Sequence, residues 1–274
     1  MVLLAAAGCS SARFTTPERY GKGLVLCVGG AGGIQVDANN FRQGLEDGGV
    51  PYAIEVYNWS SHLLLLDQMD ESDNRRKACQ LARRIENYRH LYPERPVYLV
   101  GVSAGTGLIV WALEGLTSGQ RATGAVLVAS SLSAKYDLTA ALEKVDDHIY
   151  NFYSRVDPVL GLGVPMAGTV DRNGGIAGGL VSFSLPDGAS ARTRDLYRDR
   201  LVQFGWEAED ARLGNVGDHL GGTRARFVAQ RIAPLVLGKG LRANQVTAGL
   251  RPGGAGAAPM GPAIPAEASK GAAP

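Results

Sequence analysis

The chain has 274 residues, with 28 basic and 26 acidic side chains and a formal net charge of +2. This length allows one large domain with a substantial core, and the near balance of charge gives no reason to expect a nucleic-acid partner. No stretch approaches the ~18 consecutive apolar residues that a membrane-spanning helix needs. The composition is therefore that of an ordinary globular protein.

The amino terminus contains the run Ala-Ala-Ala-Gly-Cys at 5–9, which resembles the end of a bacterial lipoprotein signal. In that family the chain is cleaved before the cysteine, and the cysteine receives a lipid. The resemblance implies a lipid on Cys9, membrane contact through that lipid, and a protein anchored to the cell envelope outside the cytoplasm. The alternative is an apolar terminus with an accidental cysteine, in a cytoplasmic protein. Residues 1–22 are interpreted as this signal-like segment and a linker.

Strands and helices alternate in the first half of the chain. Residues 23–28 form a nearly continuous apolar run that ends in glycines, which is typical of a strand buried on both faces. Residues 52–59 are the next predicted strand. The segment 72–91 repeats apolar residues at helical spacing and ends before Pro93, so it predicts an amphipathic helix.

The most informative turn is Gly-Val-Ser-Ala-Gly at 101–105, between an apolar strand over 97–100 and an apolar helix over 108–116. A Gly-x-Ser-x-Gly turn in this context holds its serine, here Ser103, in a strained and exposed conformation. The serine oxygen then stands at the N-terminus of a helix, where backbone N–H groups can bind a developing anion.

The second half continues the alternation, which implies an α/β fold with a mostly parallel sheet and helices on both faces over residues 23–240. Residues 161–190 are rich in glycine and lack periodicity, so we expect a loop excursion there rather than core. Residues 241–274 are mostly Ala, Gly and Pro, which predicts a disordered tail. The remaining predicted elements are strands over 124–129, 148–153 and 201–206, and helices over 138–145 and 223–237, with Asp137 as the cap of the first.

A reactive serine needs a base that takes its proton and a third group that orients the base. His219 lies in a glycine-containing loop before the last helix, from which an imidazole can reach a strand end. Asp157 stands just past the strand over 148–153, and an ordinary Asp-Pro turn is its alternative explanation. His219 alone would be read as a surface loop residue. The chain order Ser103, Asp157, His219 makes these three the candidate catalytic residues.

With this ordered set, residues 23–237 resemble the α/β-hydrolase family. The resemblance implies an eight-stranded sheet or a trimmed version of it, and catalysis through an acyl-enzyme. It implies that Ser103 is the nucleophile, His219 the general base and then acid, and Asp157 the orienting carboxylate. The short connection between residues 129 and 153 leaves no room for a large lid there.

The same resemblance implies an oxyanion hole made of two backbone N–H groups. One belongs to Ala104, which follows the nucleophile, and the other comes from the glycine loop over 29–33, where we expect Ala31 to be the donor. An alternative interpretation of this loop is a dinucleotide-binding fingerprint, but Gln35 stands where its last glycine belongs. We therefore expect no cofactor.

Two further features have open interpretations. The site is expected to be open, or covered by the segment 161–190 and the loop that carries Trp59 and the leucine run at 63–66. The leucine run suggests an apolar surface for an acyl chain, or a turn of a core helix. Cys27 and Cys79 are expected to be buried free thiols, and no residues have the spacing of a metal site, so we expect no metal.

The sequence thus predicts a serine hydrolase that cleaves carboxylic ester or thioester bonds of a lipid-like or small acyl substrate. Acyl transfer with the same three residues is one alternative. A hydrolase-like surface lipoprotein that binds a ligand without catalysis is another.

Overall fold

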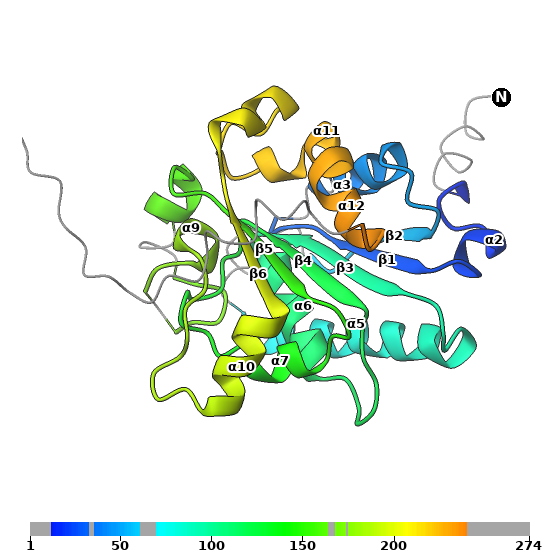
Figure 1. Ribbon diagram of the computed structural model, residues 1–274, viewed down its shortest axis with the longest axis horizontal. Helices are drawn as coiled ribbons and strands as arrows, with labels where there is room; N and C mark the ends of the chain where they lie inside the picture. Colours follow the sequence, from blue (N-terminus) through cyan, green and yellow to red (C-terminus); the bar gives the residue numbers. More distant parts are fainter. Residues whose placement is uncertain (1–11, 33–35, 61–69, 164–167, 174, 240–274) are drawn as a thin grey trace, which may run out of the picture.

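A parallel β-sheet runs through the centre of the computed structural model, which describes residues 12–32, 36–60, 70–163, 168–173 and 175–239 (Figure 1). Within these residues the sheet has six strands in the order β2-β1-β3-β4-β5-β6, and every neighbouring pair is parallel. The predicted parallel sheet is confirmed. The strands are β1 (Leu24–Val28), β2 (Ala53–Tyr57), β3 (Val97–Val102), β4 (Gly124–Val128), β5 (Ile149–Tyr153) and β6 (Leu201–Gly205).

Helices cover both faces of the sheet, and this explains the apolar runs in the sequence. All residues of β1, β3 and β4 are buried, because a strand between two helical layers has no solvent-facing side. Figure 1 shows α3, α11 and α12 on one face and α5, α6, α7 and α10 on the other. The bounds are α3 (Val36–Asp47), α5 (Glu71–Leu91), α6 (Ala104–Glu114), α7 (Thr139–Glu143), α10 (Ala191–Arg200), α11 (Ala225–Phe227) and α12 (Ala233–Val236). The shorter elements are α2 (Pro17–Tyr20), α9 (Gly178–Val181), the π-helical turns η1 (Val159–Gly163) and η4 (Val228–Ile232), and the 3-10 turns η2 (Ala208–Leu213) and η3 (Gly221–Thr223).

The strand order reverses direction at β1. The chain first moves from β1 outward to β2, and then crosses to β3 on the other side of β1. The helix that follows β1 therefore covers one face and the helix that follows β3 covers the opposite face, as α3 and α6 do (Figure 1). In open parallel sheets such a switch point leaves a crevice at the carboxyl ends of the strands, where ligands bind.

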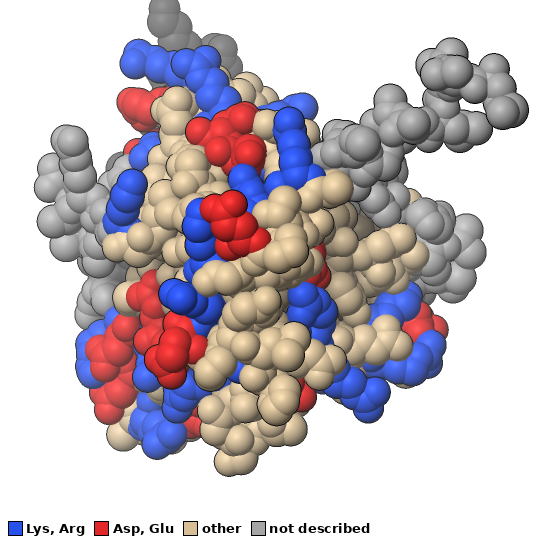
Figure 2. All heavy atoms as spheres, turned by 90° about the vertical axis from the view of Figure 1, so that its right-hand side faces the viewer, with Lys and Arg blue, Asp and Glu red and all other residues tan. Residues whose placement is uncertain are grey.

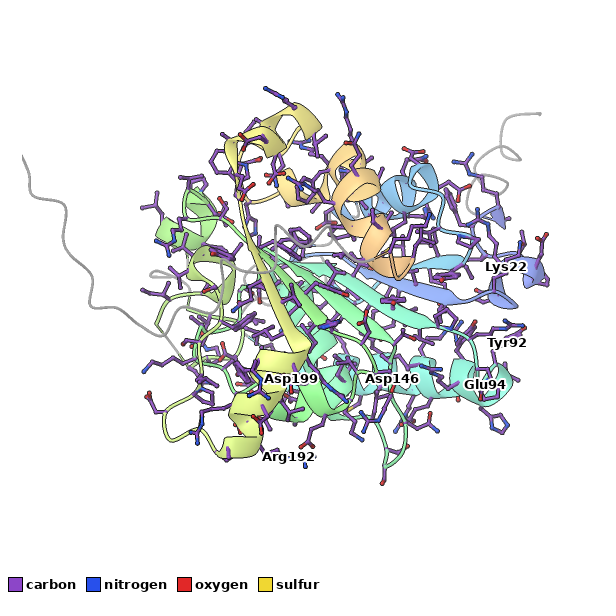
Figure 3. All side chains as sticks on the ribbon, viewed as in Figure 1. Lys22, Tyr92, Glu94, Asp146, Arg192 and Asp199 are labelled. Carbon is purple, nitrogen blue, oxygen red and sulfur yellow. The ribbon has the colours of Figure 1, made fainter. Side chains whose placement is uncertain are left out.

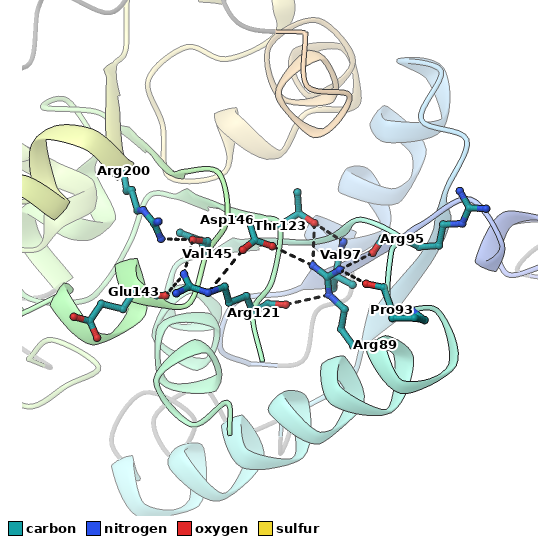
Figure 4. A network of polar contacts seen from close by, with 10 residues as sticks. All are labelled: Arg89, Pro93, Arg95, Val97, Arg121, Thr123, Glu143, Val145, Asp146 and Arg200. Carbon is teal, nitrogen blue, oxygen red and sulfur yellow. Dashed lines mark hydrogen bonds and ion pairs between the residues drawn. The ribbon is translucent and has the colours of Figure 1, made fainter. Parts of the chain in front are cut away.

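The opposite edge of the sheet, where the strands begin, is held by polar contacts. Lys22, Glu94 and Asp146 precede β1, β3 and β5 and lie along this edge (Figure 3). Arginine side chains donate hydrogen bonds to backbone carbonyls there, as Arg89 does to Pro93 and Arg121 (Figure 4). Figure 2 shows basic and acidic side chains interspersed over the face on the right-hand side of Figure 1.

Part of the segment over 161–190, which its composition predicts to be a loop excursion, packs into the core. Val170 is fully buried in the core against α6, and Ala177 pairs with Ser133 in an antiparallel bridge. A Cβ on Gly179 would lie 2.1 Å from the backbone nitrogen of Ser130. The glycines here allow the backbone to pack closely, so the expectation of a segment outside the core is wrong for this part of it.

Several helices differ from the predictions. Two long helices were not predicted: α3, in which Phe41 and Leu45 point into the core, and α10, whose residues are mostly charged. The predicted helix over 223–237 consists of α11, η4 and α12 in succession. Pro234 has no N–H to continue the regular hydrogen-bond ladder, and the π-helical turn η4 directly precedes the segment that contains it.

Both described cysteines are free, but only one is buried. Cys27 lies in β1, where burial raises the pKa of its thiol. Cys79 is exposed, because the buried stripe of α5 runs through Ala78, Leu81 and Ala82 and leaves position 79 outside it. The expectation of two buried thiols is therefore wrong for Cys79. No helix in the described ranges combines the length and apolar character that a bilayer crossing requires.

We expect iodoacetamide to alkylate Cys79 in the folded protein and to leave Cys27 unmodified until denaturant is added. The thiolate is the reacting species, and Cys27 is both inaccessible and held in its neutral form. Peptide mass spectrometry after timed alkylation measures both sites. Equal alkylation rates for the two cysteines in the folded protein would contradict the burial of Cys27.

Candidate active site

The turn between β3 and α6 holds Ser103 in an unfavourable backbone conformation. Ser103 has φ 54° and ψ −128°, and α6 begins at the next residue, Ala104, rather than at 108 as predicted. A non-glycine residue with positive φ costs about 1–3 kcal/mol and persists only where the surroundings hold it. The Ser103 N–H donates to the carbonyl of Val128 (3.0 Å), and its carbonyl accepts from the Thr106 hydroxyl (2.6 Å). These contacts fix the serine at the crevice between β1 and β3.

A close backbone contact explains the second glycine of the turn. A Cβ on Gly105 would lie 2.2 Å from the carbonyl oxygen of Gly29 and 2.9 Å from that of Val28. Any side chain at 105 would therefore push the first turn of α6 away from the loop that follows β1. Gly30 of that loop is also close to the serine, since a Cβ built on it would lie 3.4 Å from Ser103 Cβ.

Asp157 and His219 are paired, although 62 residues separate them. Asp157 Oδ2 lies 2.8 Å from His219 Nδ1, the Asp157 side chain is fully buried, and 13% of the His219 side chain is exposed. Asp157 Oδ1 accepts hydrogen bonds from the N–H groups of Val159 (2.9 Å) and Leu160 (3.0 Å). Both carboxylate oxygens are thus occupied, and the contact favours the tautomer with the proton on Nδ1 and a free Nε2.

The loop that carries His219 is tied to the ends of two strands. The Ser154 hydroxyl, just after β5, donates to the Gly217 carbonyl (2.7 Å). Trp206, just after β6, donates from Nε1 to the Asn215 carbonyl (2.8 Å). The Asn215 side chain in turn accepts from the Gly217 N–H (3.0 Å). These positioning residues could not be predicted, because the sequence around a serine or a tryptophan carries no signal that it will contact a distant loop.

A pocket borders the acid–histidine pair at the carboxyl ends of β4, β5 and β6. Asp157 and His219 line it together with an ion pair between Asp210 and Arg231 (2.6 Å). Ser103 is not among its lining residues, so the pocket adjoins the pair rather than the serine. Its apolar lining is mainly aromatic and includes Phe152, Tyr153, Phe204, Trp206 and Phe227.

The structure thus brings two of the three candidate catalytic residues into contact. Ser103 lies at the carboxyl edge of the same sheet, but its hydroxyl makes no hydrogen bond within the described residues. Hydrogen bonds of catalytic groups are often long before substrate binds. The interaction of His219 with the Ser103 hydroxyl, which catalysis would require, stays a prediction.

The two predicted oxyanion donors belong to the two segments that meet at the serine turn. Ala104 is the first residue of α6 and Ala31 is in the loop after β1. Within the described part of the chain, neither N–H donates a hydrogen bond, whereas the Gly30 N–H donates to Asp37 (2.8 Å). Gln35, which stands in place of the last glycine of a dinucleotide-binding fingerprint, lies outside the described residues.

Trp59 is buried and contacts the loop after β1. It is 5% exposed, and its Nε1 donates to the carbonyl of Gly29 (2.8 Å). The leucine run at 63–66, which suggested an apolar acyl surface, lies outside the described residues. His148 pairs with Asp147 at the opposite edge of the sheet, as its place before β5 predicts. Over the described ranges, no group of three or more His, Cys, Asp or Glu side chains could hold a metal ion.

Comparison with solved structures shows that this is the α/β-hydrolase fold. Aspergillus fumigatus lipase B is similar with a TM-score of 0.51 and 12% identity, over 81% of this chain and 54% of that one, so this chain spans about half the length of the lipase. A lipase-esterase related protein from Clostridium acetobutylicum matches with a TM-score of 0.45 and 10% identity, over 80% and 96% of the two chains. A cutinase-like protein from Cryptococcus sp. matches with a TM-score of 0.42 and 14% identity, over 82% and 98%. No protein-family model and no curated protein matches the sequence.

We expect Gly217→Ala to lower the free energy of unfolding more than Gly188→Ala does. Both glycines have positive φ (87° and 73°), but a Cβ on Gly217 would lie 2.5 Å from Val156, whereas Gly188 has open space around it. The steric conflict adds ~1–3 kcal/mol to the conformational cost that the two variants share. Urea unfolding of both variants measures the difference. Equal losses would show that the His219 loop does not pack as described.

Proposed function

We propose that this protein is a serine hydrolase that cleaves carboxylic ester or thioester bonds through an acyl-enzyme. The observation that carries the proposal is the buried Asp157–His219 pair, at the same sheet edge as a serine held at positive φ at the N-terminus of a helix. The likeness in fold to a protein named as a lipase supports an ester bond as the reacting group. The substrate we propose is a lipid-like or small acyl ester.

The proposed reaction uses each residue in turn. His219 Nε2 takes the proton of the Ser103 hydroxyl as its oxygen attacks the substrate carbonyl, and Asp157 stabilises the imidazolium that forms. The tetrahedral intermediate collapses, and His219 gives the proton to the departing alcohol or thiol. Water then attacks the acyl-enzyme with His219 again as the base, which releases the carboxylic acid and restores Ser103.

The developing negative charge would be held by backbone N–H groups. Those of Ala104, at the start of α6, and Ala31, in the loop after β1, donate no hydrogen bond elsewhere in the described structure. Fixed donors of this kind stabilise the oxyanion without reorganisation during the reaction.

Labelling by a fluorophosphonate probe tests the proposal directly. We expect Ser103 to be labelled, Ser103→Ala to abolish labelling, and His219→Ala and Asp157→Asn to slow it by about 10⁴-fold. His148→Ala is the matched control, because His148 also pairs with an aspartate but lies at the opposite edge of the sheet. The label is located by peptide mass spectrometry.

Two results would decide against the proposal. Failure of the folded parent protein to react would favour a ligand-binding protein without catalysis. Equal slowing in the His148 control would show that the Asp157–His219 pair has no special role. Products other than the free acid, formed when alcohol or amine acceptors are added, would indicate acyl transfer by the same residues.

We also propose that Cys9 carries a lipid that anchors the protein to the bacterial cell envelope. This rests on the run before Cys9 alone, and residues 1–11 lie outside the described residues. We expect the protein from a bacterial host to incorporate labelled palmitate and to lose the label in Cys9→Ser. An intact, unmodified Met1 and Cys9 in the isolated protein would contradict the proposal.

A further inference from the structure

Asp37 is a buried carboxylate in the first turn of α3, close to the proposed active site. It is 7% exposed, and both of its oxygens accept hydrogen bonds from backbone N–H groups. Oδ2 accepts from Gly30 (2.8 Å) and Oδ1 from Ala38 (2.7 Å). No Lys, Arg or His forms an ion pair with Asp37 within the described ranges. A carboxylate buried in this way is unfavourable unless hydrogen bonds satisfy it, so its position beside the glycine loop needs a reason.

The hydrogen bond to Asp37 removes one candidate donor from the oxyanion hole. The Gly30 N–H points to the carboxylate and cannot also bind an oxyanion. The next N–H along the loop, that of Ala31, donates to no group in the described structure. Asp37 therefore decides which backbone N–H of the loop is left for a ligand.

The same loop is fixed from two other directions. Trp59 donates to the Gly29 carbonyl (2.8 Å), and that carbonyl oxygen also lies against Gly105 in the first turn of α6. The loop is thus held by its carbonyl at Gly29 and by its N–H at Gly30. Between them, these contacts leave it little freedom to turn relative to Ser103.

We propose that Asp37 is the positioning residue of the oxyanion hole, which holds the loop after β1 so that the Ala31 N–H faces the reacting carbonyl. This inference rests on the proposed hydrolase function. Asp37 itself does not touch the substrate. Because the oxyanion is absent from the bound substrate and forms only on the way to the tetrahedral intermediate, loss of Asp37 should lower kcat and leave KM nearly unchanged.

The test compares Asp37→Ala and Asp37→Asn with the parent protein in the hydrolysis of p-nitrophenyl butyrate. We expect kcat to fall by about 100-fold in Asp37→Ala, as for the loss of one oxyanion donor, with KM within about twofold. Asp37→Asn keeps one acceptor oxygen, so its kcat should fall less than that of Asp37→Ala. Asp47→Asn is the matched control, since Asp47 accepts one hydrogen bond at the exposed end of the same helix.

Trp59→Phe tests the same loop without changing a charge, and it keeps the inference testable if Asp37→Ala fails to fold. It removes the hydrogen bond to Gly29 together with part of the buried indole ring, and it should also lower kcat rather than raise KM. Unchanged kcat in folded Asp37 variants, a loss confined to KM, or an equal loss in Asp47→Asn would overturn the inference. A parent protein with no esterase activity and no labelling of Ser103 would instead overturn the proposed function.

Discussion

The contact between the first turn of α6 and the loop after β1 is the constraint on which the proposed site depends. At Gly105 the two backbones approach so closely that no side chain fits between them. This contact sets the distance between Ser103 and the N–H groups of the loop, and it is possible only at the switch point, where the helices after β1 and β3 leave on opposite faces. The strained conformation of Ser103 is stable because hydrogen bonds to β4 and within α6 hold it.

Asp157 and His219 are held in place differently. They lie in segments with little regular structure, and hydrogen bonds from side chains fix the backbone of these segments. The His219 loop contains little regular structure, yet Ser154, Trp206 and Asn215 each hydrogen-bond to its backbone or that of a neighbouring residue. One carboxylate oxygen of Asp157 accepts hydrogen bonds from two N–H groups of its own turn, and the other oxygen contacts the histidine. A loop fixed in this way can present an imidazole as firmly as a strand could.

The expectations that proved wrong concern which residues are buried. The segment over 161–190 was expected to lie outside the core because it is rich in glycine, but at Gly179 the glycine permits close backbone packing. Cys79 was expected to be a buried thiol, but it lies outside the buried stripe of α5. Burial depends on which face of an element packs against its neighbours, and residue type alone does not specify that face.

The parallel sheet, the serine turn and the candidate residues Asp157 and His219 could all be predicted from the sequence. Those features are local: an apolar run of strand length, a glycine on each side of a serine, an acid just past a strand. Three contacts became visible only in the folded chain: Asp157 pairs with His219, Ser154 and Trp206 hold the histidine loop, and Asp37 accepts a hydrogen bond from the Gly30 N–H. These are single hydrogen bonds between segments that the fold brings together, and no periodicity or spacing along the chain encodes them.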